Sequence, residues 1–465
     1  MSAYSPFSRD ISELTAEDLV ALRDTSEGWY IEYKREVPNA SSIAKSVSAF
    51  ANTYGGWVFY GIVEKSKENP VAEAFPGIAE TEIDGALQRI RQAVATQVVP
   101  APHFDHKVIY GPSTNISLAD GYAVICLWCG SSISAPHVHK NGQIYRRVAD
   151  GSEPKPENDR FILDQLWRRG DEMRKAYKKW VRRDPEFSKG EQEIPFIRIL
   201  IDADPLYERG AWLPVSIQQV REIMNSEQRD FGPLPFDTIY TSSNGFVCRQ
   251  ARGNDPHNLS LTWKLNRHLH SDVIIPLSFY RANNVRDALL PLRPGYHFTA
   301  RFQSILEEAG FQNTRVVDLN FIFNIFAGIV ETQTRLAEAA SWSHPFQVKL
   351  RLLNAWRTIP FVDVDGVLKG LEHSGVPVCM DETVTAPVGY GPDDFREMPT
   401  LDHIENRAAR ILVQASIMFE LLATAYGIPS WDAMETGDLT SYHFEDLIEA
   451  GKRATDNQRV RLARK

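Results

Sequence analysis

The sequence predicts a mixed α+β fold with two domains: an N-terminal α/β domain and a separate C-terminal α+β domain. The chain has 465 residues, which is more than a single hydrophobic core usually organises. Helical and strand-like segments alternate in the first third, whereas the pattern changes from about residue 194 onwards. We therefore expect a helical leader at 1–24, the first domain at 25–183, a linker at 184–193 and the second domain at 194–465.

The composition indicates a globular protein of the cytoplasm. Hydrophobic residues make up 43% of the chain and charged residues 24%, as in soluble domains. No uninterrupted apolar run is long enough to span a bilayer, and MSAYSPFSRD lacks the layout of a signal peptide. Four cysteines argue against a disulfide scaffold and fit a reducing compartment. The net charge of −9 excludes a uniformly basic nucleic-acid coat, but local basic patches can still bind nucleic acid.

The N-terminal part predicts a compact set of elements in the order helix-β-α-β-α-β-β. Its leader, ISELTAEDLVALRD, is expected to form a helix with Thr15 as the N-cap. Two further helices are predicted at 41–52 and 80–97, where apolar residues recur at helical spacing. Runs rich in β-branched and aromatic residues predict strands at 29–33, 57–63, 122–129 and 143–148.

The C-terminal part predicts a core of its own. Strands are expected from 194 and within 259–281, and Asn244-Gly245 between two apolar runs predicts a hairpin. A long helix is expected to begin with Asp402 as N-cap, where Glu405 would complete a capping box. This helix and the apolar run FIFNIFAGIV are candidates for the subunit interface of a homo-oligomer, although core packing explains their apolar stripes more simply.

The stretch EGWYIEYKRE, residues 27–36, contains the strongest candidate site. Glu32 and Lys34 are two positions apart, so on a strand they share one face. Glu27 lies five positions before Glu32 and would reach the same place only from the preceding glycine-containing turn. Glu64 follows the next predicted strand, where α/β folds commonly carry reactive groups.

Convergence of these three carboxylates predicts a site for a divalent metal ion. The carboxylates would raise one another's pKa unless a cation neutralised them, and all-oxygen ligands favour Mg²⁺ or Mn²⁺. Such an ion could activate water while Lys34 stabilises negative charge on a phosphate. The catalytic candidates are Glu27, Glu32, Lys34 and Glu64, with the three glutamates as metal ligands. A strand with a solvated polar face is the simpler explanation of the residues taken alone.

Several basic residues are candidates for contacts with nucleic-acid phosphates. Arg146 and Arg147 are adjacent on a predicted strand, so one of them points inward and needs an anionic partner. That partner is either a bound anion or a carboxylate of a structural salt bridge. The segment 168–183 is rich in Lys and Arg and predicts a basic helix, whose face is either solvated or bound to nucleic acid. The candidate contacts are Arg146, Arg147, Lys45, Arg174 and Lys178.

Three other motifs favour structural roles. CLWC at 126–129 has metal-site spacing, but an offset of three on a strand places its thiols on opposite faces, so we expect core packing rather than zinc. PHVHK at 136–140 has no partner cluster nearby and is assigned to a loop. Gly55-Gly56 indicates a tight helix-to-strand turn, because neither GxxxxGK[ST] nor GxGxxG is present.

Four sequence blocks, in this order, resemble the Schlafen AlbA_2 domain. They are E-x4-E-Y-K at 27–34, VSAFANTYGGWVFYGIVE at 47–64, VVPAP at 98–102 and APHVHKNGQIYRRVADGSEP at 135–154. The AFANT-x-GG-x4-G core of the second block is the most specific part. The resemblance covers residues 24–165 and says nothing about the C-terminal half.

The resemblance implies functional roles for particular residues. In nucleolytic Schlafens three acids form a metal-dependent RNase site, and position by position these acids correspond to Glu27, Glu32 and Glu64. It also places Lys34 beside that site. The family's GVDD segment reads GIVE here, so the third carboxylate is kept but is longer by one methylene.

We expect a metal-dependent endoribonuclease that uses Mg²⁺ or Mn²⁺ to cleave structured RNA such as tRNA, in a setting such as bacterial antiphage defence. The alternative is a non-catalytic transcriptional regulator of the same fold, which would bind DNA or RNA through the basic helix and would not need the carboxylates. A nucleotide-binding signalling module is a weaker alternative. The C-terminal half is expected to sense a partner or to form a homo-oligomer, without membrane contact.

Overall fold

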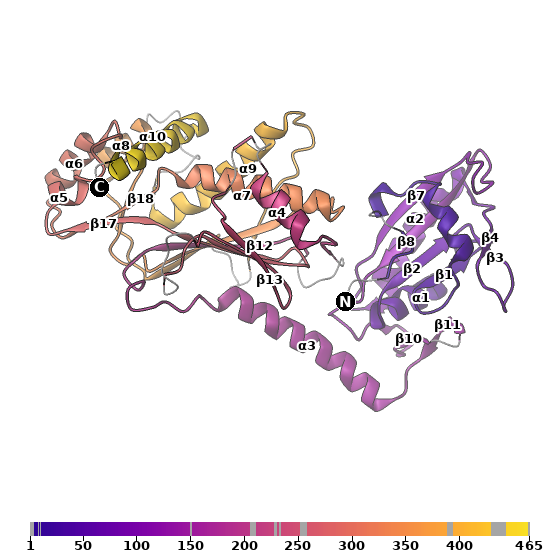
Figure 1. Ribbon diagram of the computed structural model, residues 1–465. Helices are drawn as coiled ribbons and strands as arrows, with labels where there is room; N and C mark the ends of the chain where they lie inside the picture. The colour runs from indigo at the N-terminus through magenta and orange to yellow at the C-terminus, as the bar shows by residue number, and fades with distance from the viewer. Residues whose placement is uncertain are drawn as a thin grey trace. The chain divides into compact units, whose positions relative to one another are not determined.

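The computed structural model describes residues 4–463 except 8, 10, 149–150, 205–210, 227–229, 232–233, 252–257, 388–393 and 429–442. The chain forms two compact units (Figure 1). The first contains residues 1–180 and two short later segments, and the second contains most of 181–465. Both units contain helices and strands, so the predicted mixed α+β class is confirmed.

The first unit is built on a five-stranded mixed sheet. Strand β1 (Ile31–Lys34) runs parallel to β2 (Gly56–Tyr60), which pairs antiparallel with β8 (Tyr122–Cys129). Strand β8 also pairs with β5 (Ile78–Ala79) and β7 (Asp105–Tyr110). Because β2 and β8 are buried on both faces, they read as continuous apolar runs, and this pattern made them predictable.

Different layers cover the two faces of this sheet. Helices α1 (Ala40–Asn52) and α2 (Ile83–Gln97) share a core with one face. The leader covers the other face, but it forms two 3-10 helices, η1 (Ile11–Glu13) and η2 (Asp18–Asp24), rather than the expected α-helix. Thr15 is not its N-cap, because the Thr15 hydroxyl donates to Asp18 Oδ2 at 2.9 Å instead of accepting from the backbone.

Short strand pairs and one long helix complete this unit. The pairs are β3 (Val63–Glu64) with β4 (Ala72–Ala74), β6 (Val98–Val99) with β9 (Val138–His139), and β10 (Tyr145–Val148) with β11 (Gly151–Pro156).

Helix α3 (Arg160–Arg182) contains the predicted basic segment. A Cβ at Gly170 would lie 2.2 Å from a backbone oxygen, so α3 approaches the adjoining loop closely. Arg169 donates to the carbonyl groups of Ala51, Thr53 and Ser132.

The second unit contains an eight-stranded sheet with helices over it (Figure 1). Its strands are, in spatial order, β13 (Thr238–Ser242), β14 (Gly245–Arg249), β15 (Thr262–Asn266), β16 (Ser271–Pro276), β12 (Phe196–Asp202), β19 (Gln347–Leu353) and β21 (Thr383–Ala386), with β22 (Arg396–Glu397) on β19. Ser242 pairs with Gly245, which confirms the predicted hairpin. The helices are α4 (Ile217–Asn225), α7 (Ile322–Ala339) and α9 (Arg407–Tyr426).

Helices α7 and α9 pack against each other, and much of the apolar stripe of each is buried within the unit. Core packing therefore accounts for both stripes. Helix α9 begins four residues later than predicted, because Asn406, not Asp402, accepts the capping bond, from Ala409 N at 3.2 Å. It is the one described helix with the length and composition of a membrane span, and a core helix passes the same test.

A smaller three-stranded sheet lies in the same unit. Strand β18 (Thr314–Asp318) pairs antiparallel with β17 (Ser278–Ala282) and parallel with β20 (Ile359–Phe361). The helices around it are α5 (Val285–Leu289), α6 (Thr299–Glu308), α8 (Asp365–Ser374) and α10 (Phe444–Ala463). The basic segment from Lys452 is helical as far as Ala463.

The segment 184–193, which we expected to be a linker, makes specific contacts within the second unit. Asp184 Oδ1 lies 3.4 Å from Arg198 Nη1, and the ring of Phe187 stacks on Phe196 at 4.9 Å between centroids. The division between the units falls at Trp180, in the last part of α3. The Pro and Gly content of 184–193 suggested a linker, but the aromatic and acidic side chains of this segment have partners that are distant in the sequence.

Candidate functional site

Glu32 lies at the centre of a buried charged cluster on β1, and its side chain is only 1% exposed. Its Oε1 accepts a hydrogen bond from Ser46 Oγ of α1 at 2.9 Å and lies 3.1 Å from Lys34 Nζ. Its Oε2 lies 3.1 Å from Arg147 Nη1. Both oxygens of this carboxylate are therefore engaged by donors from the protein.

Arg147 is the inward-pointing arginine of β10, and its partner is the Glu32 carboxylate. The guanidinium is fully buried, lies 4.8 Å from the centre of the Phe50 ring, and donates from Nε to Gly28 O at 3.0 Å. It also donates to Ile31 O at 3.2 Å. Arg147 therefore fixes the turn before β1, and it presents no exposed group to a phosphate, contrary to our expectation.

Glu27 reaches this cluster from the turn that precedes β1. Its Oε1 accepts the backbone N–H of Tyr33. Burial raises the pKa of Glu27 from 4.5 to about 7; the Tyr33 N–H and Lys34 lower it, and the charges of Glu64 and Glu32 raise it further. Glu27 therefore exchanges a proton near neutral pH.

Lys34 and Glu64 complete the group of predicted catalytic residues. Glu64 is half-buried on β3, opposite Ala72 of β4, and its charge contributes to the raised pKa of Glu27. Burial works against the charged form of Lys34, but the Glu32 and Glu27 carboxylates outweigh it and raise the Lys34 pKa. The charges of Glu32, Lys34 and Glu64 all act on Glu27, although separate segments contribute the four side chains.

The donor set has the chemistry of a site for Mg²⁺ or Mn²⁺, because carboxylate oxygens are the ligands these ions prefer. Within the part of the chain that the structure describes, no group of three or more His, Cys, Asp or Glu side chains has metal-binding geometry. Lys34 and Arg147 hold the Glu32 oxygens that an ion would need. The side chain of Lys34 is 35% exposed, so it is the partner that an ion could displace.

Tyr60 is a site residue that the sequence did not reveal. It pairs with Lys34 across β1 and β2, and its buried hydroxyl has no hydrogen-bond partner among the described residues. Burial, together with the Glu32 charge, raises the Tyr60 pKa far above its ordinary value, so the hydroxyl stays protonated. Tyr60 is 1% exposed, so this O–H is enclosed within the domain beside the Glu32 charge. Its apolar strand context gave no signal of this placement.

Four aromatic side chains form a partly exposed aromatic cluster in the same unit, made of Tyr4, Trp29, Tyr30 and Tyr54. The ring centroids are 4.9 Å apart for Tyr4 and Tyr30, 6.2 Å for Tyr30 and Tyr54, and 5.6 Å for Trp29 and Tyr54. Tyr54 is 48% exposed and Tyr4 41%. Trp29 and Tyr30 stand between Glu27 and Glu32 in the sequence. Exposed aromatic faces of this kind can stack on unpaired bases.

The other predicted nucleic-acid contacts differ in how accessible their charges are. Arg174 and Lys178 are exposed on α3. Lys45 is half-buried on α1, with its ammonium 5.4 Å from the centre of a tyrosine ring. Arg146 is held by Glu157, with Nη1 and Oε2 2.6 Å apart. The exposed face of α3 therefore retains the clearest basic surface among the predicted contacts.

The CLWC and PHVHK segments have structural roles. Cys126 lies in the core beneath the leader, and Cys129 lies in the core beneath α1 and α2, so the two thiols are on opposite faces as predicted. His137 is buried, and its Nδ1 lies 2.6 Å from Pro100 O. Burial lowers the pKa of His137 to about 4, so this imidazole is neutral at physiological pH and Nδ1 donates to the carbonyl.

Residues 27–156 match the family model described as Schlafen, AlbA_2. The N-terminal third of the chain is therefore a Schlafen AlbA_2 domain, which confirms the resemblance of the four sequence blocks. This family covers nuclease-like and nucleic-acid-binding members, so the domain has a nucleic-acid-related function. All four predicted catalytic residues lie inside the matched segment.

Among solved structures, the chain is similar to the DIP2311 protein from Corynebacterium diphtheriae, with 16% identity and a TM-score of 0.20. The similarity covers 45% of this chain and 33% of that protein, so this chain spans about a third of its length. A likeness of this size carries no information about fold or activity. No curated protein matches the chain.

Proposed function

We propose that the first unit is a metal-dependent endoribonuclease that cleaves structured RNA such as tRNA. One observation supports this proposal above the others: the charges of Glu32, Glu64 and Lys34 all act on the Glu27 carboxylate. A domain that only bound nucleic acid would gain nothing from three acids so placed, because carboxylates repel phosphates.

The residues of the cluster have distinct roles in this reaction. Bound Mg²⁺ or Mn²⁺, held by Glu27, Glu32 and Glu64, would supply Lewis-acid activation of water and phosphate. The pKa of about 7 belongs to Glu27 without an ion; a bound cation would favour the ionised carboxylate, which is the form that a metal ligand needs. Lys34, whose side chain is 35% exposed, provides positive charge for the phosphate.

Arg147 acts as a positioning residue. It fixes one oxygen of Glu32, while Ser46 and Lys34 contact the other. In this arrangement Glu32 binds an ion only after Lys34 has moved, and an approaching phosphate is a group to which Lys34 can move. Substrate binding would therefore prepare the site for the metal ion.

The surfaces of the unit support RNA as the substrate. The aromatic cluster can stack on unpaired bases, which structured RNA exposes in loops, bulges and ends. The basic face of α3 can contact phosphates, and such contacts make binding strongly dependent on salt. Cytoplasmic antiphage defence is the setting in which we propose this activity operates.

The test is cleavage of a total tRNA pool by the full chain with Mg²⁺ or Mn²⁺. We expect cleavage to disappear with EDTA and to fall at least about 100-fold in Glu27→Gln, because even residues that only support a metal ligand cost up to about that much. Glu68→Gln is the matched control, because Glu68 is exposed nearby in the sequence, and it should cleave like the wild type. RNA binding without metal, measured by fluorescence anisotropy, should be equal in all three proteins.

A non-catalytic regulator is the second candidate, and the engagement of Glu32 favours it. A carboxylate whose two oxygens already contact Arg147, Lys34 and Ser46 satisfies a structural role without any ion. Tight, salt-sensitive binding of DNA or RNA, without cleavage in the presence of any metal ion, would establish the regulator and overturn the nuclease proposal.

A further inference from the structure

The second unit contains a pocket of about 470 Å³ that the family match does not cover. It lies between the ends of β16 and β17, the turn from β18 into α7, and helix α10. Its wall is mainly apolar and aromatic, and includes Leu261, Ile275, Ile325, Tyr280, Tyr296 and Phe321. This volume is in the range of sites for small organic molecules.

Acidic residues stand at the carboxyl ends of two parallel strands beside this pocket. Asp318 is the last residue of β18, and Asp363 follows β20, which pairs in parallel with β18. Asn320 lies in the turn that leads into α7. Ligands of α/β folds bind at this edge of a parallel sheet, where loops leave the strands.

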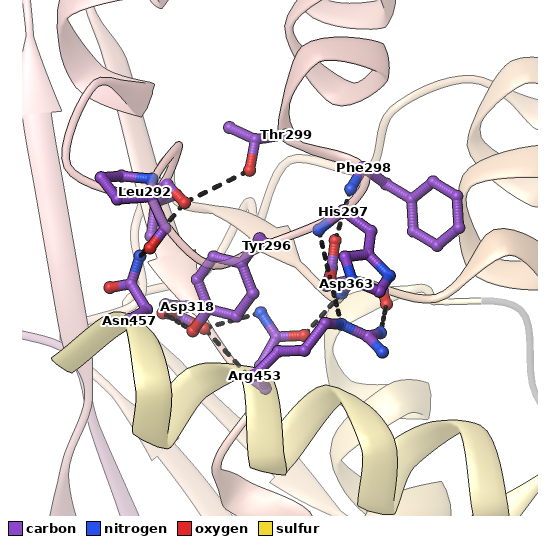
Figure 2. Close-up of polar contacts among 11 residues, drawn as sticks. Leu292, Tyr296, His297, Phe298, Thr299, Asp318, Asp363, Arg453 and Asn457 are labelled. Atoms are coloured by element: carbon purple, nitrogen blue, oxygen red, sulfur yellow. Dashed lines mark hydrogen bonds and ion pairs between the residues drawn. The ribbon is translucent and has the colours of Figure 1, made fainter. Parts of the chain in front are cut away.

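Among the residues that the structure describes, neutral groups hold Asp318. Its Oδ2 accepts from the Tyr296 hydroxyl at 2.6 Å, and its Oδ1 accepts from Asn320 N at 3.1 Å and Nδ2 at 2.8 Å (Figure 2). Among the described residues no Lys, Arg or His forms an ion pair with Asp318. Burial raises the pKa of Asp318, and the nearby Asp363 charge adds to this effect.

Asp363 has the cation that Asp318 lacks. Arg453 of α10 contacts Asp363 Oδ2 at 2.5 Å, and the backbone N–H groups of His297 and Phe298 donate to the same carboxylate at 3.1 and 2.8 Å (Figure 2). Asp363 is therefore neutralised within the protein. Of the described residues that line the pocket, Asp318 is the one charged side chain.

We propose that this pocket binds a small organic cation with an aromatic or apolar body, whose protonated nitrogen pairs with Asp318. A carboxylate in an apolar wall is costly unless a positive group joins it. The faces of Tyr280, Tyr296 and Phe321 would add cation–π attraction and apolar contact. The C-terminal unit would in this way detect a small molecule, independently of what the first unit does to nucleic acid.

The test compares two indole compounds of similar size and opposite charge: tryptamine, a cation, and indole-3-propionate, an anion. Isothermal titration with the full chain at neutral pH should show tryptamine binding at least tenfold more tightly. Asp318→Asn keeps the shape of the side chain and should weaken tryptamine binding at least tenfold. Glu308→Gln, an exposed acid on α6, should bind like the wild type.

A second variant and a stability measurement separate ligand binding from a structural role. Phe321→Ala removes a 43% exposed ring and should weaken tryptamine binding without lowering the melting temperature. Asp318→Asn should melt at or above the wild-type temperature at neutral pH, because it removes a buried charge without an ionic partner. Equal binding of both indoles, no binding at millimolar concentration, or unchanged binding by Asp318→Asn would each overturn the proposal.

Discussion

The Glu32–Arg147 pair joins residues 115 positions apart in the sequence and determines the chemistry of the site. It fixes the orientation of Glu32, fills the space beside it and anchors the turn that carries Glu27. The same pair limits access of an ion to Glu32. One buried arginine therefore links the stability of the domain to its proposed activity.

Replacing Arg147 tests this structural role. Arg147→Met leaves the Glu32 carboxylate buried with one cation fewer, so we expect a loss of about 3–5 kcal/mol in the free energy of unfolding. The measurement is the calorimetric transition of the first unit. Arg91→Gln, on the exposed side of α2, should change it by less than about 0.5 kcal/mol. A loss below about 1 kcal/mol for Arg147→Met would show that Lys34 and Ser46 suffice to stabilise the buried Glu32 carboxylate.

The raised pKa of Glu27 predicts a pH-dependent stability. Its pKa is about 7 in the folded protein and 4.5 in the unfolded chain, so the folded state holds the extra proton between these values. Ionisation therefore destabilises the fold as pH rises from 4.5 through 7, and Glu27→Gln removes this effect. The stability gain of Glu27→Gln should grow by about 2 kcal/mol between pH 5 and pH 8. A gain independent of pH would contradict the buried position of Glu27, and saturating Mn²⁺ should abolish the wild-type slope if the ion binds there.

Among the elements, the turn between α1 and β2 explains the most specific block of the sequence. Gly55 has a φ of +76°, and a Cβ there would lie 2.8 Å from Cys129 O and 2.9 Å from Ser131 N. The chain thus needs glycine for both conformation and space, so that β2 can lie against β8. The glycines that resembled a phosphate loop serve this close approach.

Two glycine substitutions should have opposite effects. Gly55→Ala forces a side chain into backbone atoms at a positive φ and should destabilise the first unit by at least about 2 kcal/mol. Gly85→Ala lies in α2 with no atom within 4 Å of the new Cβ and should stabilise it by about 0.5–1 kcal/mol. Thermal unfolding of the two variants beside the wild type checks both signs, and a neutral Gly55→Ala would show that the turn can rearrange.

At the scale of the whole molecule, each unit has its own hydrophobic core. In the first unit, cores lie on both faces of the five-stranded sheet. In the second unit, one core surrounds β18 and β20 with helices α5, α6 and α8. Because the chain divides at Trp180 into two units that each have a core, we expect the two to unfold separately.

Calorimetry of the full chain should therefore show two transitions. Phe302→Ala removes a fully buried ring from the second unit and should reduce the free energy of unfolding of that unit by about 3–5 kcal/mol. Only the transition of the second unit should therefore move to lower temperature. Gly55→Ala should lower the transition temperature of the first unit alone. A single transition that both variants shift equally would show that the units unfold as one.

Local pattern was enough to predict the mixed class, strands β2, β8 and β12, helices α1 and α2, and the hairpin at 244–245. These elements are long or contain residue types typical of turns, so the pattern of neighbouring residues indicates their burial and backbone conformation. Spacing and family resemblance also predicted that Glu27, Glu32, Lys34 and Glu64 form one site, and this stays a prediction. The two-residue strands, the 3-10 leader and the start of α9 were missed or misplaced, because short elements and competing caps leave little periodic signal.

Only the tertiary structure decided the partner of Arg147, the unpaired hydroxyl of Tyr60 and the unneutralised Asp318 in its pocket. Each depends on which side chains meet across segments far apart in the chain, and on how deeply they are buried. Sequence spacing encodes the face of an element but not what lies opposite that face. The sequence therefore predicted a carboxylate site, whereas packing determined which charged side chains are neutralised and which are left to pair with a ligand.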